Sequence, residues 1–122
     1  MKHAALLAVA ALCAGAAAWM PFREPRQISG WYRISWEEQS FTPCGGSERW
    51  WVADPGPLMA RYRQVVTRGD WGTVYATVRA EVSDPGRFGH MGMYPRSIAI
   101  REVVAARAPG DNDCRERSVE AR

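Results

Sequence analysis

The segment that decides the fold runs from Trp71 to Val82 and reads WGTVYATVRAEV. Apolar side chains recur at every second position, so they fall on one face of an extended chain. This alternation predicts a strand over residues 71–82 with one face against the core. The inward set is Val74, Ala76, Val78, Ala80 and Val82, and the outward set is Thr73, Tyr75, Thr77, Arg79 and Glu81.

Three other segments have the features of strands. Residues 28–37 alternate apolar and polar positions, residues 48–53 are short and aromatic, and residues 97–105 are rich in β-branched side chains. Proline and glycine break the chain between them, at 43–46, 54–57 and 84–86. The inward face of the first segment is predicted to be Tyr32, Ile34 and Trp36.

Residues 58–68 have helical spacing instead. Pro57 suits the first turn of a helix, and Gly69 suits its C-terminal end. The predicted apolar face consists of Leu58, Tyr62, Val65 and Val66.

This order of elements predicts a mainly β fold. A small OB-like antiparallel barrel with one inserted helix is the first expectation, and an open α+β sheet is the alternative. The barrel domain is expected over residues 28–106, after an irregular segment at 19–27. A charged tail is expected over residues 107–122.

Residues 1–18 have the organisation of a signal peptide. A positive start, Met1-Lys2-His3, is followed by an apolar run and then by small residues at 15–18. We therefore expect a periplasmic or secreted protein. Two alternatives would hold it at the membrane. One is lipidation of Cys13, which favours a small preceding residue where this chain has Leu12; the other is an uncleaved inner-membrane anchor.

The whole chain has 16 basic and 13 acidic residues. Removal of the leader would take away its only lysine, Lys2, and leave arginines as the remaining Lys/Arg residues. The charges are interspersed, with no basic block, which argues against nucleic acid as a partner. The expected partner is instead an envelope component or a small ligand.

The cysteines predict one covalent link. Cys13 would leave with the leader, and Cys44 and Cys114 would remain in an oxidising compartment. A disulfide between them would close a loop of about 70 residues, and chain entropy limits its stabilisation to about 4 kcal/mol.

Tryptophan is abundant: the chain has six, and five of them lie beyond Trp19. The simplest interpretation places most of these large rings in the core of a small domain. A surface that stacks on carbohydrate or another ligand is the alternative. The five are Trp31, Trp36, Trp50, Trp51 and Trp71.

The segment Gly89-His90-Met91-Gly92-Met93-Tyr94 could carry metal chemistry. An imidazole beside two thioethers suits Cu(I), so His90, Met91 and Met93 are candidate copper ligands. A glycine-rich turn whose histidine bonds to backbone is the alternative. No cofactor is otherwise expected.

Catalysis is not expected. Glu37 and Glu38 are adjacent in a predicted strand and should point to opposite faces, and His90 is the only histidine beyond the leader.

By analogy with OB-like barrels, aromatic and arginine side chains could instead bind a ligand on the barrel surface. The candidates are Trp51, Tyr75, Arg79 and Arg96.

Four short segments also support a family resemblance. Gly30-Trp31-Tyr32, residues 40–45, Arg49-Trp50-Trp51-Val52 and residues 89–94 resemble the C-terminal OB-like domain of the NlpE lipoproteins and small bacterial envelope proteins like it. The resemblance covers residues 28–105. It implies an OB-like barrel in the cell envelope, in a group associated with copper tolerance and surface sensing. The chain has no C-x-x-C motif and no good lipobox, so the resemblance does not carry copper tolerance or surface sensing over to it.

Overall fold

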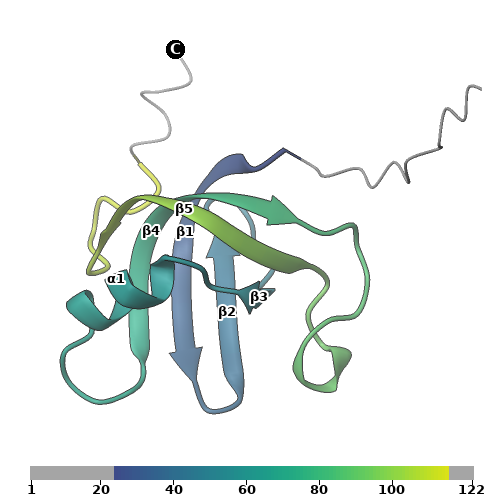
Figure 1. Cartoon of the computed structure of the whole chain (residues 1–122), viewed down its shortest axis with the longest axis horizontal. Coiled ribbons are helices and arrows are strands. Elements are labelled where there is room, and N and C mark those ends of the chain that lie inside the picture. The colour runs from purple at the N-terminus through teal and green to yellow at the C-terminus, as the bar shows by residue number, and fades with distance from the viewer. Residues whose placement is uncertain (1–23, 116–122) are drawn as a thin grey trace, which may run out of the picture.

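The computed structural model describes residues 24–115 (Figure 1). The predicted leader, Cys13 and the end of the predicted tail lie outside these residues. The elements in chain order are β1 (Arg26–Ser35), β2 (Glu38–Pro43), β3 (Trp50–Asp54), α1 (Leu58–Val65), β4 (Gly72–Val82), the 3₁₀ turn η1 (His90–Gly92) and β5 (Ser97–Arg107).

The five strands close into a barrel in the order β1-β2-β3-β5-β4, with β4 pairing back to β1. The prediction of a small barrel with one inserted helix is confirmed, and the sheet is not open. The predicted antiparallel pairing is wrong for one pair, because β3 and β5 run parallel. Parallel neighbours need a crossover connection, and here α1 and β4 supply it.

Strand β2 is an element that the sequence pattern did not reveal. The predicted strand over residues 28–37 ends at Ser35, and the chain reverses at Trp36 and Glu37. Glu37 takes a positive φ of 52°, although this turn contains no glycine, asparagine or proline to signal it. Trp36 therefore lies in the turn and is 72% exposed, so its predicted inward position is wrong.

The predicted inward face of β4 is confirmed. All five of its apolar residues are buried in the barrel core, together with Tyr32, Phe41 and Ile98. Helix α1 packs Leu58 and Tyr62 into the same core, with Val65 and Val66 at its edge. The helix ends at Val65 rather than Arg68, because Val66 takes extended backbone angles.

The expectation that most tryptophans fill the core is wrong for the described residues. Trp50 alone is buried among the five, at 7% exposure. The interior of the barrel is filled by smaller rings and aliphatic side chains. Trp31 and Trp51 are partly buried, and Trp36 and Trp71 are exposed in loops.

A C-terminal clasp, residues 107–114, covers part of the outer barrel surface. The disulfide between Cys44 and Cys114 is confirmed, with the two Cα atoms 5.4 Å apart. The Arg107 guanidinium lies 4.4 Å from the centre of the Tyr75 ring, and the Cys114 backbone N–H donates to the Tyr75 hydroxyl. Tyr75 points outward from β4, as predicted, yet the clasp buries it.

Asp113 holds the clasp to the barrel. Its carboxylate accepts hydrogen bonds from the Trp31 indole N–H at 2.9 Å and from the Gly110 backbone N–H, and it pairs with Arg107. These contacts order the first part of the predicted tail as far as the disulfide. Within residues 24–115, no helix has the length and hydropathy needed to span a bilayer.

Candidate functional site

The candidate site arises where two neighbouring strands separate. β2 and β3 pair at only two positions, Ser40 with Trp51 and Phe41 with Trp50. β3 then continues along β5, with Val52 opposite Ile98. The beginning of β2 and the end of β3 therefore diverge, and a hollow opens between them. We call it the β2–β3 groove.

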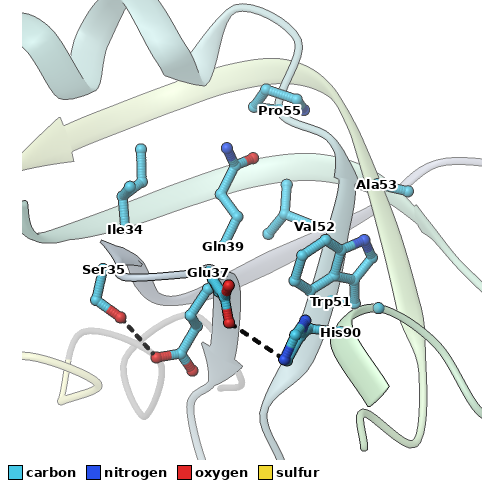
Figure 2. Close-up of a pocket in the computed structure, with 11 residues that line it drawn as sticks. Ile34, Ser35, Glu37, Gln39, Trp51, Val52, Ala53, Pro55 and His90 are labelled. Carbon is cyan, nitrogen blue, oxygen red and sulfur yellow. Dashed lines mark hydrogen bonds and ion pairs between the residues drawn. The ribbon is translucent and has the colours of Figure 1, made fainter. Parts of the chain in front are cut away.

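The groove has an apolar floor and a polar rim (Figure 2). Its volume is about 720 Å³, within the range of small-molecule sites. Figure 2 shows the Gln39 side chain between Ile34 and Val52. The floor includes Ile34, Val52, Ala53 and Pro55, and the rim includes Ser35, Glu37, Glu38, Gln39 and His90.

Trp51 forms one wall of the groove, and its ring is held from behind. Its ring centre lies 5.3 Å from that of Tyr94. The backbone of Gly89 lies against the indole so closely that a Cβ there would overlap with the ring. Gly89 also has a positive φ of 69°, which disfavours any other residue. The indole is therefore fixed in position beside the groove.

Two loops meet at the rim through a contact between an imidazole and a carboxylate. His90 Nε2 lies 3.2 Å from Glu37 Oε2, and both side chains are about half exposed (Figure 2). Glu37 belongs to the β1–β2 turn and His90 to the β4–β5 connection. Glu37 is thus not in a strand, so the prediction that it and Glu38 occupy opposite faces of one is wrong.

Glu38 is held ionised by its neighbours. It accepts a hydrogen bond from Ser35 and pairs with Arg49 at 2.7 Å. Burial opposes ionisation, yet the Ser35 hydroxyl and the Arg49 guanidinium hold the pKa of Glu38 below its usual value. Burial and the Glu38 carboxylate in turn raise the pKa of Tyr94, so its hydroxyl stays protonated. The rim therefore carries fixed hydrogen-bonding groups.

The four predicted ligand-binding residues do not form one site. Trp51 lines the groove, but Tyr75 is buried beneath the clasp and is not available to a ligand. Arg79 pairs with Glu102 at 3.6 Å on the outer face of β4. Arg96 donates to the Ser83 carbonyl and lines a different hollow. The barrel's closure and the clasp separate residues that the analogy with OB-like barrels had grouped together.

The predicted copper ligands are only partly brought together. His90 and Met93 line a common hollow of about 150 Å³, while Met91 occupies the tip of η1 and is 75% exposed. His90 is already paired with Glu37. Within residues 24–115, no group of three or more His, Cys, Asp or Glu side chains is placed to hold a metal ion.

Sequence reasoning missed most of the groove, because it missed β2. Ser35, Gln39 and Glu38 approach Trp51 only when the chain reverses at residues 36–37. One signal was present in the sequence: the glycine-rich segment at 86–92 indicated close backbone approach, and Gly89 makes such an approach to Trp51.

Comparison with family profiles, curated proteins and solved structures returned no match.

Proposed function

We propose that this chain is an exported OB-like binding module of the cell envelope that holds a saccharide in the β2–β3 groove. The OB-like assignment is supported by the closed five-stranded barrel, its strand order and the helix between β3 and β4. OB folds bind oligosaccharides and oligonucleotides over strands 2 and 3, between the β1–β2 and β4–β5 loops. The groove occupies this position.

The observation that carries the proposal is the fixed Trp51 ring facing a rim of hydrogen-bonding groups. The apolar C–H face of a sugar ring can stack on an indole, while its hydroxyls need donors and acceptors nearby. The amide of Gln39 supplies both a donor and an acceptor at the rim. A nucleic-acid ligand fits less well, because Glu37 and Glu38 would face its phosphates.

A binding role is favoured over a catalytic one by the state of the two rim carboxylates. Glu38 is occupied by Ser35 and Arg49, and Glu37 is occupied by His90. A general acid or base needs a free proton site within reach of the substrate. The pairing of Glu38 with Arg49 therefore supports a site that holds its ligand without transforming it.

The test is a titration with N-acetylchitotetraose, followed by tryptophan fluorescence and by NMR of the indole N–H and side-chain amide groups. We expect saturable binding with shifts at Trp51 and Gln39. Trp51→Ala should weaken binding at least tenfold, because the stacking surface is lost. Trp71→Ala is the matched control, since Trp71 does not line the groove, and it should bind as the unchanged protein does. Equal binding by both variants would exclude this site.

A copper-binding accessory role is the second proposal. It is supported by the hollow that His90 and Met93 share, and by the exposure of both methionine side chains. His90 contacts Glu37 through Nε2, which leaves Nδ1 as the ring nitrogen that Cu(I) would use. A Cu(I) competition titration tests this: affinity no tighter than micromolar, or equal affinity in His90→Ala, would exclude it.

A further inference from the structure

The exposed large hydrophobic side chains gather in three loops. Four of the five found among residues 24–115 belong to the β1–β2 turn, the α1–β4 connection and the β4–β5 connection; the fifth is Val104 in β5. Their exposed fractions are 58–77%. We call this group the aromatic pole: Trp36, Trp71, Met91 and Met93.

The three loops are neighbours in space. The rings of Trp36 and Trp71 meet edge to face, with their centres 6.2 Å apart. On the other side of the same turn, Glu37 pairs with His90 at 3.2 Å, which joins the loop that carries both methionines. Figure 1 shows the three loops at the lower end of the barrel, away from the point where the described chain enters β1.

The backbone conformation at the pole favours projection of these side chains. Met91 takes a positive φ of 60° at the tip of η1, between residues 90 and 92. A non-glycine residue in this conformation is uncommon and carries strain. Glu37, beside Trp36, is also left-handed. Two loop tips therefore hold strained backbone and present a large apolar side chain.

The charges around the pole indicate what covers it. Arg68 lies in the α1–β4 connection and Arg87 in the β4–β5 connection, where its side chain is near Gly92. Arg33 is close to the end of β1. All three are exposed, and none has an ion pair within the described part of the chain. Of the acids in the same loops, Glu37 contacts His90 and Asp84 has an interaction of its own, which leaves Asp70 beside the three arginines.

We infer that the aromatic pole docks on the surface of an anionic lipid bilayer. Tryptophan is favoured at the headgroup level of membranes, and arginine pairs with lipid phosphates. Separate loop tips can each enter a headgroup layer, whereas a folded protein partner would need a complementary surface. Single apolar anchors bind membranes reversibly, and adjacent basic residues strengthen the attachment.

This inference is independent of the saccharide proposal, since none of the four pole side chains is among the residues of the groove. The groove lies at the same end of the molecule, because Glu37 and His90 belong to both the rim and the pole loops. A bilayer-docked barrel would therefore hold its groove close to the membrane surface.

The test is flotation of the exported protein with vesicles of phosphatidylcholine containing about 30% phosphatidylglycerol. Pure phosphatidylcholine vesicles are the comparison. We expect binding to the anionic vesicles, a blue shift of tryptophan emission, and loss of binding at high salt. The double variant Trp36→Ala/Trp71→Ala should reduce the bound fraction at least fivefold. Val104→Ala, the matched control away from the pole, should leave it unchanged.

Met91→Ser/Met93→Ser provides a second test if the tryptophan variant is poorly folded by circular dichroism. It should also lower binding to anionic vesicles. The inference is overturned if the protein does not float with these vesicles, or if both double variants float as well as the unchanged protein does. A concentration-dependent dimer that the tryptophan variant abolishes would instead assign the pole to a second copy of this chain.

Discussion

The two aromatic pairs on the outside of this barrel differ in how they are covered. Trp31 and Tyr75, whose ring centres lie 6.0 Å apart, are overlaid by the clasp. Trp36 and Trp71, 6.2 Å apart, lie at the aromatic pole with more than half of their surfaces exposed. The first pair of rings is therefore packed beneath another segment of the chain, whereas the second pair is open to solvent.

The difference shows how a small barrel treats rings that its interior cannot hold. The clasp is an additional segment. It brings a carboxylate that accepts from the Trp31 indole N–H and a guanidinium that stacks on Tyr75, and the disulfide fixes it to the barrel. Within residues 24–115 no comparable segment reaches Trp36 and Trp71. We therefore expect the clasp to act on stability and the pole to act on binding.

The largest expected effect comes from removing the disulfide. Cys44→Ala/Cys114→Ala should lower the free energy of unfolding by up to about 4 kcal/mol, because a loop of about 70 residues is no longer closed in the unfolded chain. Urea denaturation measures the change. The unchanged protein in reductant should lose a similar amount, and a loss below about 1 kcal/mol would show that the clasp is held without the covalent link.

Asp113→Ala should have the next largest effect. The substitution removes the acceptor of the Trp31 indole N–H and the carboxylate partner of Arg107, and a lost charged hydrogen bond costs about 1–3 kcal/mol. Acrylamide quenching of tryptophan emission should rise as Trp31 becomes accessible. Asp111→Ala, an exposed acid in the same segment, is the control and should change stability by less than about 0.5 kcal/mol.

Acid should reproduce part of that effect. Burial opposes ionisation of Asp113, but hydrogen bonds from Gly110 and Trp31 and the Arg107 charge hold its pKa below the usual value. The folded state therefore gains stability from this carboxylate above its unfolded pKa of about 4 and loses it as the pH falls through the lowered value. The stability difference between the unchanged protein and Asp113→Asn should shrink over this acidic range in denaturation curves, and a constant difference would contradict the assignment.

The smallest expected effect on stability is at the pole. Trp36→Ala/Trp71→Ala removes two exposed rings with one ring–ring contact, so the free energy of unfolding should fall by less than about 0.5 kcal/mol, below the range expected for Asp113→Ala. Thermal unfolding measures this directly. A loss as large as that of Asp113→Ala would mean that the pole is a structural contact, and the comparison would fail.

The fold was predictable where alternation and burial coincide. The inward face of β4 and the apolar face of α1 follow from spacing, because burial there depends on the direction of each side chain from its own element. The β1–β2 turn was not predictable, because residues 36–37 carry no turn-forming residue. Its reversal converts one predicted strand into two and creates half of the groove.

The site was less predictable than the fold. Trp51 was identified as a candidate, but its partners at the rim come from β2 and from the turn before it. Tyr75 was assigned to a ligand surface because it faces outward, and the clasp overturns that assignment. Outward direction in a strand does not ensure exposure when a distant segment folds over it.

The amino-acid sequence alone predicted the class of the fold, the inner face of its strand at residues 72–82 and the pairing of Cys44 with Cys114. These depend on local periodicity and on counting. Tertiary structure alone decided which aromatic rings are covered, where the β2–β3 groove opens and which loops share the aromatic pole. These depend on contacts between residues far apart in the chain, and closure of the barrel decides which of those residues become neighbours.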